Sequence, residues 1–421
     1  MSHTAELIAV GTELLLGNIA NTDAQMISQG LSGIGINVFY HTVVGDNPER
    51  LRAAVEIAKR RADILITTGG LGPTCDDLTK NVLAAAFGKK LVFDEASAQR
   101  IRAYFQKLHA RRPMTENNLQ QAMLPEGCTI LPNDWGTAPG CAFYADGVHV
   151  IMLPGPPSEC RPMFQHRVVP YLQALSEGVI ASHTLKLFGI GESQMEAQLR
   201  DEMNAMSNPT LAPYAKEGEC ELRVTAKAPT MEQAQALLLP KVEELKARFG
   251  TRVYGVDVSS LEEVVEDLLR EKGLTLGCAE SITGGLMAKR LTDIPGSSQV
   301  FRGGVVSYTN EVKAGVLGVP QHLLDQFGAV SPEVARAMAD GARRLLGCDI
   351  ALSATGVAGP GKDEWDHEVG TAFVAISTAE GAHVRALNLG SRPVRARLRT
   401  QTAHHAFDLA RRYLSGLPFE D

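Results

Sequence analysis

The sequence predicts an α/β protein: two separate three-layer α/β domains with mainly parallel sheets, joined by a small α/β domain in the middle. A chain of 421 residues is longer than one hydrophobic core usually serves. Short apolar runs that suit buried strands alternate with amphipathic stretches of helical length. This alternation favours parallel sheets covered by helices on both faces. We expect domain boundaries at residues 1–175, 176–256 and 257–421.

The first segment begins with repeated strand and helix patterns. The apolar run AELIAVG ends in glycine and predicts a buried strand, followed by a helix from about Asn21 to Gly33. INVFYHTVVG and ADILITTGG predict two more strands, with the helix PERLRAAVEIAKRRA between them. VHVIMLPGPP, further along, is expected to extend the same sheet.

The middle segment repeats the alternation on a smaller scale. HTLKLFG, CELRVTAKA and TRVYGV predict strands, and two helical stretches separate them. The layout loosely resembles a KH domain, which grips nucleic acid through a GxxG loop. GIGE at Gly189 to Glu192 does not fit that loop, so we expect a spacer or oligomerisation module without direct nucleic-acid binding.

The third segment is again α/β. LEEVVEDLLREKG predicts an amphipathic helix closed by Gly273. Strands are expected at LTLGCAES, GGVVSYT, DIALSATGVAG and GTAFVAIST, and helices at ITGGLMAKRLTD and SPEVARAMADGARRLL.

Composition narrows the class of protein. A hydrophobic content of 44% and a charged content of 21% are ordinary for globular proteins. The formal net charge of -7 gives no general attraction to nucleic acid or to an anionic membrane. The sequence has no apolar run of the ~20 residues that span a bilayer, and its amino terminus lacks signal-peptide features. Seven scattered cysteines without a CxxC pair indicate reduced thiols. We therefore expect a cytoplasmic enzyme with no membrane partner.

Ser281 is the first candidate for chemistry. It lies where a strand gives way to Thr283-Gly284-Gly285 and a helix, a turn that presents a hydroxyl at the carboxyl edge of the sheet. A serine needs a base, and Lys313 can serve if burial lowers its pKa. Tyr308 could relay the proton or donate it to a leaving amine. Backbone amides near Thr283 to Gly285 are natural donors to an oxyanion.

Spacing alone leaves another interpretation open. A serine at a strand-to-helix turn is more often an N-cap than a nucleophile, and Tyr or Lys near a strand end is commonly a surface residue. Two more features favour a phosphorylated small molecule. TGVAGPG, residues 355–361, suits backbone contact with an anion, although it is also an acceptable turn. Arginines 392, 395, 397 and 399 precede the last helix and can pair with phosphate, although they also suit a solvated helix face.

These residues resemble a known family. AESITGG, PGSSQVFRGGVVSYTNEVK, GAVS and TGVAGPG are similar to the carboxy-terminal domain of the CinA (competence/damage-inducible protein) family, which also occurs alone as nicotinamide mononucleotide amidohydrolase. The resemblance implies hydrolysis of nicotinamide mononucleotide to nicotinate mononucleotide and ammonia, without a cofactor. It assigns catalysis to Ser281, Tyr308 and Lys313. The substrate contacts expected with it are Thr283, Gly284, Gly285, Asn310, Thr355, Gly356, Gly359, Arg392 and Arg399.

Three positions depart from the family pattern. Ile282 replaces the cysteine of AESCTGG, which leaves the serine in place. KDEWDHEVGT stands where the family commonly has glycines and PVGT, so the loop Lys362 to Glu368 is more acidic and bears on substrate selection. Gly390-Ser391-Arg392 replaces GDR, which leaves open the arginine that meets phosphate.

The first segment carries its own set of candidate residues. GTELLLG follows the first strand and TTGGLGPTCDDLT the third, so both glycine-rich turns suit an anion cradle at one sheet edge. Carboxylates beside phosphate oxygens hold hard divalent cations, although aspartate at a helix start is usually a cap. We expect Glu13, Asp46 and Asp77 to converge at this edge.

The first segment resembles the CinA amino-terminal domain, which is itself similar to the molybdopterin-binding domains of MogA and MoeA. The resemblance lies in the order of seven motifs: GTELLLG, NTDA, VGDN, GGLGPTCDD, NNLQQAMLPEG, NDWGTAPG and LPGPPSE. The resemblance implies a nucleotide or pterin pocket at Gly69, Gly70, Gly72, Asp76 and Asp77 and, in some members, metal-dependent cleavage of ADP-ribose to AMP and ribose 5-phosphate. It implies a divalent metal (Mg²⁺, Mn²⁺ or Co²⁺) at Asp76 and Asp77, allows potassium, and suggests a homodimer. A non-catalytic nucleotide-binding adaptor linked to competence or DNA damage remains the alternative.

Overall fold

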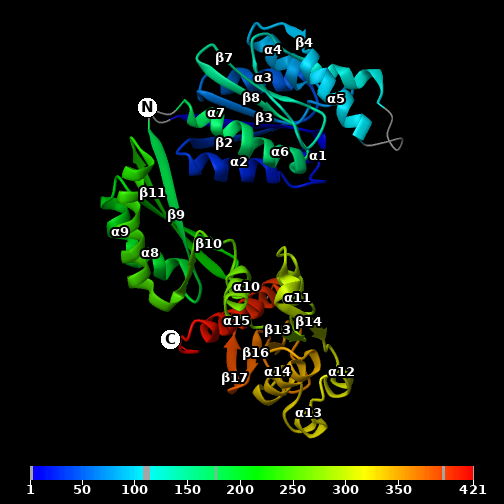
Figure 1. The fold of residues 1–421 in the computed structure, drawn as a ribbon, viewed down its shortest axis with the longest axis vertical. Helices are drawn as coiled ribbons and strands as arrows, with labels where there is room; N and C mark the ends of the chain where they lie inside the picture. The colour runs from blue at the N-terminus through cyan, green and yellow to red at the C-terminus, as the bar shows by residue number, and fades with distance from the viewer. Residues whose placement is uncertain (1–2, 108–113, 176–177, 391–393, 421) are drawn as a thin grey trace. The chain divides into compact units, whose positions relative to one another are not determined.

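The computed structural model describes residues 3–107, 114–175, 178–390 and 394–420. These residues form two compact units (Figure 1): Met1–Ala181 with Ala226–Gln235, and Ser182–Thr225 with Ala236–Asp421. The second unit combines most of the middle segment with the carboxy-terminal segment.

The first unit is built on a six-stranded sheet with the order β2-β1-β3-β8-β7-β6. The first four of these strands run parallel, and β7 and β6 continue the sheet antiparallel. The strands are β1 (Thr4–Val10), β2 (Asn37–Val44), β3 (Ile64–Thr68), β6 (Thr129–Leu131), β7 (Gly140–Ala145) and β8 (Val148–Leu153). A two-stranded antiparallel sheet of β4 (Leu91–Phe93) and β5 (Met123–Pro125) accompanies it.

Helices cover both faces of this sheet (Figure 1), because its central strands are apolar on both sides. The helices are α1 (Thr12–Leu15), α2 (Thr22–Gly33), α3 (Pro48–Ala58), α4 (Thr79–Ala86), α5 (Glu95–Lys107), α6 (Pro157–Met163) and α7 (Val169–Gln173). One core contains side chains of α3 and α4, and the other contains those of α2 and α6. Asn21 caps α2 by accepting a hydrogen bond from the Ala24 amide at 3.1 Å.

The middle segment forms a four-stranded sheet with the order β10-β11-β9-β12. Its strands are β9 (Val179–Leu187), β10 (Thr210–Lys216), β11 (Glu219–Ala228) and β12 (Val253–Val256), and its helices are α8 (Glu192–Ala205) and α9 (Met231–Phe249). The sequence analysis omitted β10, which pairs antiparallel with β11 from Thr210 to Lys216. Its proline and exposed side chains hide the alternation typical of a strand.

The carboxy-terminal sheet has the order β14-β13-β15-β16-β17. Its strands are β13 (Leu276–Glu280), β14 (Phe301–Val306), β15 (Ile350–Gly356), β16 (Thr371–Thr378) and β17 (Gly381–Asn388). The first three run parallel, and β16 and β17 add an antiparallel hairpin. The predicted fold class is thus confirmed, with antiparallel strands at one edge of each large sheet.

Two layers of helices enclose this sheet. α10 (Leu261–Lys272), α11 (Leu286–Thr292) and α15 (Arg395–Leu414) contribute to the core on one face. α13 (Gln321–Phe327) and α14 (Pro332–Leu346) contribute to the core on the other, and α12 (Asn310–Gly315) follows β14. Gly273 closes α10 at φ 66°, as the sequence predicts.

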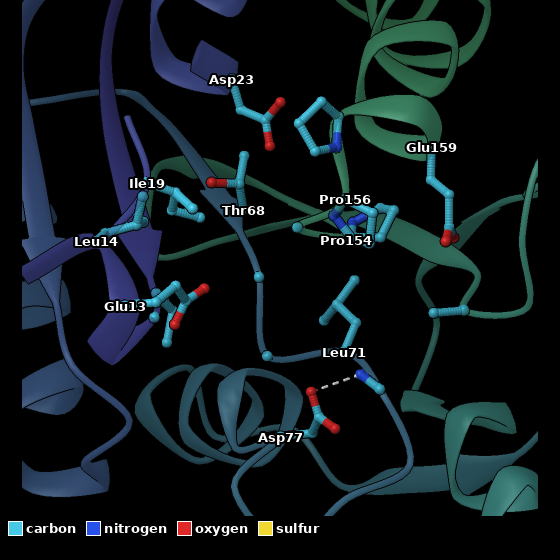
Figure 2. A pocket seen from close by; sticks show the side chains of 18 of the residues that line it. Glu13, Leu14, Ile19, Asp23, Thr68, Leu71, Asp77, Pro154, Pro156 and Glu159 are labelled. Carbon is cyan, nitrogen blue, oxygen red and sulfur yellow. Dashed lines mark hydrogen bonds between the residues drawn. The ribbon is translucent and has the colours of Figure 1, made fainter. Parts of the chain in front are cut away.

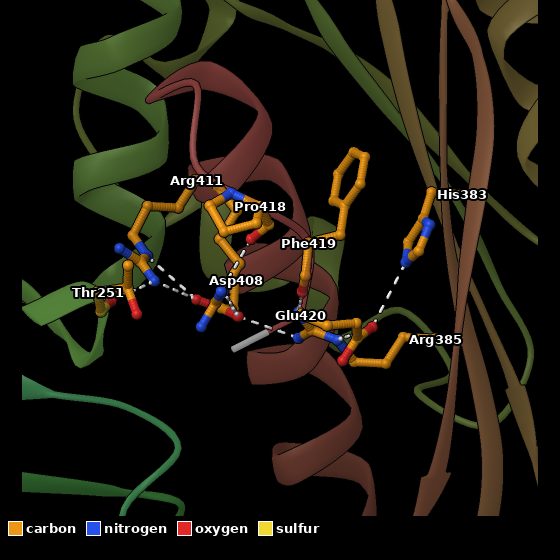
Figure 3. A network of polar contacts seen from close by, with 9 residues as sticks. Thr251, His383, Arg385, Asp408, Arg411, Pro418, Phe419 and Glu420 are labelled. Atoms are coloured by element: carbon orange, nitrogen blue, oxygen red, sulfur yellow. Dashed lines mark hydrogen bonds and ion pairs between the residues drawn. The ribbon is translucent and has the colours of Figure 1, made fainter.

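A buried ion network fixes α15 (Figure 3). The carboxylate of Asp408 accepts hydrogen bonds from Arg385 at 3.0 Å, Arg411 at 2.6 Å and Arg412 at 2.9 Å. Arg411 also donates to the Thr251 carbonyl at 3.0 Å, and Arg412 donates to the Pro418 carbonyl at 2.9 Å. Asp408 therefore connects the last helix to β17 through Arg385. Arg411 connects the same helix to the segment before β12, and Arg412 connects it to the carboxy-terminal tail.

Among the helices that the structure describes, none is both long and apolar enough to cross a membrane.

Candidate functional site

The turn after β13 presents Ser281. The strand ends at Glu280, and the Ser281 amide donates to the Ala354 carbonyl of β15 at 2.9 Å. Gly284 and Gly285 follow at φ 56° and 93°, conformations that a residue with a Cβ atom rarely adopts. The glycines therefore allow the chain to reverse into α11 directly behind the serine.

Lys313 contacts this serine. Its Nζ lies 3.1 Å from Ser281 Oγ and 2.8 Å from the Ser307 carbonyl oxygen, to which it donates. The residue lies on α12 and is 1% exposed. Burial lowers the pKa of Lys313 to about 8. At pH 7 roughly a tenth of the molecules therefore have an uncharged Lys313 that can accept the serine proton.

Tyr308 approaches the same site from beyond β14, which ends at Val306, three residues before the predicted end of that strand. Its side chain is 58% exposed, and its phenol oxygen accepts a hydrogen bond from Arg395 at 2.9 Å. Arg395 also donates to the Gly359 carbonyl at 2.7 Å. The arginine thus orients Tyr308 and joins it to the loop after β15.

These groups line one cavity of about 270 Å³. Ser281, Tyr308 and Lys313 face it, and the remaining lining residues are Ile282, Ala329, Val330, Thr355, Gly356, Val357, Ala358, Gly359, Gly361, Lys362, Asp363 and Arg395. The structure therefore brings the three predicted catalytic residues together, with Thr355, Gly356 and Gly359 of the predicted substrate contacts.

Other predicted substrate contacts lie outside that lining. Arg399 donates to the Thr283 carbonyl at 2.6 Å, so it supports the serine turn from behind. Thr283 itself is buried, and Asn310 lies in the first turn of α12. Arg392 falls outside the described residues. The arginine that lines the cavity is Arg395, which the sequence analysis placed in the arginine cluster without choosing it as a substrate contact.

Glu280 changes the interpretation of the serine turn. Its buried carboxylate accepts backbone hydrogen bonds from Gly285 at 2.9 Å, Met287 at 3.0 Å and Ala288 at 2.8 Å. The prediction that the Gly285 amide donates to an oxyanion is wrong, because this amide already donates to the Glu280 carboxylate at the start of α11. The Gly284 amide donates to the Ser281 carbonyl. Ile282, which lines the cavity and whose amide has no acceptor among the described residues, remains as a candidate donor.

A second pocket, of about 460 Å³, lies at the carboxyl edge of the first unit's sheet (Figure 2). Gly69 and Gly70 turn the chain after β3 at φ 94° and 66°, where a Cβ atom would meet the Val10 carbonyl and the Thr79 side chain. All seven residues predicted for the amino-terminal pocket line it: Glu13, Asp46, Gly69, Gly70, Gly72, Asp76 and Asp77.

Two of these aspartates shape the pocket. Asp77 accepts hydrogen bonds from the amides of Gly72 and Thr74, each at 2.8 Å, and so closes the glycine-rich turn. Asp46 accepts from the Thr12 amide at 2.9 Å and hydroxyl at 2.8 Å. Asp77 does not cap a helix: its donors Gly72 and Thr74 precede it, and the N-cap of α4 is Leu78. The helix-cap alternative considered from the sequence is therefore wrong for Asp77.

Two further carboxyl groups line the pocket and were missed from the sequence. Burial raises the pKa of Asp23 to about 6. Burial also raises the pKa of Glu159, which accepts a hydrogen bond from Asn133 at 2.6 Å. Asp23 lies in NTDA and Glu159 in LPGPPSE, motifs that the sequence analysis quoted without assigning a role to these residues. Their proximity to the glycine turn comes from the order of strands, which spacing along the chain does not reveal.

The pocket suits a hard cation in its chemistry but supplies few ligands alone. Six carboxyl groups line it, and no lysine or arginine is present among its described lining residues. Within the described parts of the chain, no group of three or more His, Cys, Asp or Glu side chains could hold a metal ion.

Three family models together match most of the chain. Residues 6–174 match the probable molybdopterin binding domain, 182–255 the damage-inducible protein CinA KH domain, and 258–414 the CinA C-terminal domain. A CinA-like protein of Dictyoglomus turgidum is 47% identical over 98% of this chain and 99% of its own length. This chain belongs to the CinA family.

Other relatives have similar descriptions. A putative competence-damage inducible protein of Acetivibrio thermocellus is 47% identical over 98% of this chain and 99% of its own. A solved structure of CinA from Thermoplasma acidophilum, described as of unknown function, is 34% identical, covers 39% of this chain and 95% of that one, and has a TM-score of 0.35. The family resemblance predicted from the motifs is thus confirmed, and the middle segment belongs to the CinA KH type.

Proposed function

We propose that the carboxy-terminal domain of this CinA protein hydrolyses the carboxamide of nicotinamide mononucleotide to nicotinate mononucleotide and ammonia. The observation that carries the proposal is the 3.1 Å contact between Ser281 Oγ and the buried Lys313 Nζ. A serine beside a lysine with a pKa of about 8 is an activated nucleophile that needs no histidine. The substrate follows from the family resemblance, and Arg395 at the cavity suits a 5′-phosphate.

The reaction would proceed in two halves. Neutral Lys313 takes the Ser281 proton as Oγ attacks the carboxamide carbon, giving a tetrahedral oxyanion beside the Ile282 amide. Protonated Lys313 returns this proton to the nitrogen, directly or through the Tyr308 phenol. The C–N bond then breaks, ammonia departs, and an acyl-serine with neutral Lys313 remains. Water then attacks the acyl carbon, Lys313 accepts its proton, and the acid is released with Ser281 restored.

Ammonia release from nicotinamide mononucleotide by the whole protein tests the proposal. We expect turnover by the native protein and a loss of at least a thousandfold in Ser281→Ala. Ser297→Ala, in the turn before β14 and away from the cavity, is the matched control and should retain full activity. Full activity in Ser281→Ala would show that another group is the nucleophile.

A second activity is favoured by the pocket of the first unit. We infer that it cleaves ADP-ribose to AMP and ribose 5-phosphate, supported by its glycine-rich turn and its acidic lining. Carboxylates alone repel a pyrophosphate, so exposed Asp76 would hold a divalent cation that neutralises the phosphate charge. Asp77 supports this by closing the glycine-rich turn through the amides of Gly72 and Thr74.

Formation of AMP from ADP-ribose, assayed with Mg²⁺, Mn²⁺ and Co²⁺ in turn, separates this activity from the alternative of a non-catalytic nucleotide-binding adaptor. If the protein binds ADP-ribose but forms no AMP with any of the three metal ions, the non-catalytic adaptor is favoured. Asp76→Asn should abolish AMP formation.

A further inference from the structure

The loop after TGVAGPG forms a wall of the cavity that holds Ser281. Lys362 and Asp363, the first two residues of the acidic loop 362–368, both line this cavity. The loop contains one lysine and four carboxylates, Asp363, Glu364, Asp366 and Glu368. It is one of the segments in which the sequence departs from the family pattern, and the proposed catalytic steps do not use it.

The carboxylate of Asp363 is ionised and fixed in place. Its Oδ1 accepts the amides of His367 at 2.9 Å and Trp365 at 3.1 Å, and its Oδ2 lies 2.8 Å from His367 Nδ1. Burial acts to raise the pKa of Asp363, but the hydrogen bonds from His367 outweigh it and hold the pKa below its usual value. At neutral pH Asp363 therefore places an ionised carboxylate in this wall of the cavity.

The rest of the loop leaves that charge in place. Lys362, the other charged residue of this wall, pairs with Asp366 at 3.0 Å and Glu368 at 2.7 Å. The Trp365 indole packs on Gly328, where a Cβ atom would come within 2.5 Å of its nitrogen. Because Ala329 and Val330 line the cavity next to Gly328, the indole anchors the loop to the cavity's other wall.

The Asp363–His367 pair is not a base for the nucleophile. Asp363 lines the cavity and His367 does not, whereas Lys313 already contacts Ser281. The remaining role for a fixed carboxylate facing a substrate is electrostatic. It favours a ligand with positive charge and disfavours one with negative charge in the same cavity.

We propose that Asp363 determines specificity for a cationic ring, so that the cavity selects N-substituted pyridinium carboxamides over neutral aromatic carboxamides of the same shape. This inference rests on the proposed amidohydrolase function. A pyridinium nucleotide has a formal positive charge on its ring nitrogen, and a benzene ring in its place has none. Hydrolysis turns the amide into a carboxylate, which the same negative wall disfavours, so Asp363 also promotes product release.

Ligand affinity in the full-length Ser281→Ala protein tests the inference, because that variant binds substrate without consuming it. Calorimetry would compare nicotinamide mononucleotide with benzamide ribotide, which has the same ribose phosphate and the same shape but an uncharged ring. We expect Asp363→Asn to weaken binding of the pyridinium nucleotide about tenfold. The affinity for benzamide ribotide should change by no more than about twofold. The asparagine oxygen can still accept hydrogen bonds from the Trp365 and His367 amides. Unchanged affinity for benzamide ribotide would therefore show that the cavity is intact.

Glu364→Gln is the matched control, since Glu364 is exposed, lies beside Asp363 and does not line the cavity. It removes the same charge and should leave both affinities within twofold. Three outcomes would overturn this inference but not the proposed function. Asp363→Asn could weaken the binding of both ligands equally, Asp363→Asn could weaken the binding of neither, or Glu364→Gln could have the same effect as Asp363→Asn. If the native protein releases no ammonia and Ser281→Ala does not bind the pyridinium nucleotide, the proposed function fails and the inference with it.

Discussion

Lys313 sets the pH dependence expected of the amidohydrolase reaction. A lysine with the ordinary pKa of 10.5 would be neutral in well under 1% of molecules at pH 7, whereas a pKa of about 8 raises this to roughly a tenth. Since the neutral amine is the reactive form, kcat/KM for ammonia release should rise about tenfold per pH unit below 8 and level off above it.

Initial rates between pH 6 and 10 check this profile. A rise that continues unchanged to pH 10 would mean that burial does not lower the pKa of Lys313 in the free enzyme. A flat profile would mean that its deprotonation does not control the reaction.

At the scale of single residues, the sequence predicts the proposed reacting groups better than it predicts the residues that hold them in position. Motifs identify Ser281, Tyr308 and Lys313, and the structure brings all three to one cavity. Arg395 and Glu280 escape such reasoning because their partners lie elsewhere in the fold: Arg395 holds Tyr308, 87 residues earlier. Glu280 acts through amides whose orientation depends on where α11 begins.

At the scale of elements, the start of α11 depends on Glu280. Three amides converge on one buried carboxylate, which also meets the positive end of the helix dipole. Glu280→Gln places an amide nitrogen against these donors, so we expect the free energy of unfolding to fall by about 2 kcal/mol. Because Ser281 is the next residue, kcat/KM should fall at least tenfold. Urea denaturation and the ammonia assay measure the two effects.

Glu333→Gln, in the first turn of α14, controls for removing a carboxylate from a helix start. It should change neither quantity appreciably. Unaltered stability and activity in Glu280→Gln would contradict the positioning role.

The last helix depends on Asp408 in a comparable way. Burial would raise the pKa of Asp408, but the guanidinium of Arg411, with Arg385 and Arg412, outweighs it and holds the pKa below the ordinary 3.8. A lowered folded pKa stabilises the fold above about pH 4, and this contribution is lost as pH falls through the folded value. Asp408→Asn leaves three buried arginines without their carboxylate, so the free energy of unfolding at pH 7 should drop by about 3 kcal/mol.

Urea denaturation of Asp293→Asn provides the comparison. Asp293 pairs with Lys289 on the surface of the protein, and such pairs contribute about 0–1 kcal/mol. Equal small losses in the two variants would show that the Asp408 network does not stabilise the fold.

Whole elements were predicted where apolar periodicity is strong and missed where it is weak. The buried strands β3, β13 and β15 lie within predicted runs, and β1 begins one residue before its predicted run. β10 was missed because its side chains are largely exposed, and α1 because it is a single turn. The antiparallel direction of β16 and β17 follows from the short turn between Thr378 and Gly381, which the sequence analysis did not use.

At the scale of the whole molecule, the two candidate sites belong to different units. Each is lined by residues of its own unit, so each proposed reaction should be removable without the other. In the full-length protein, Ser281→Ala should abolish ammonia release and leave AMP formation from ADP-ribose within twofold. Asp76→Asn should do the reverse, because Asp76 is exposed and its loss leaves the turn held by Asp77 intact.

Assaying both products in both variants gives four rates, and their pattern is diagnostic. Two independent catalytic sites predict that only the matched rate falls in each variant. A fall of both rates in Asp76→Asn with unchanged thermal unfolding would indicate that the pocket of the first unit regulates the amidohydrolase. That outcome would favour ligand sensing over catalysis for the first unit, because an effector site changes the activity of another site without forming its own product.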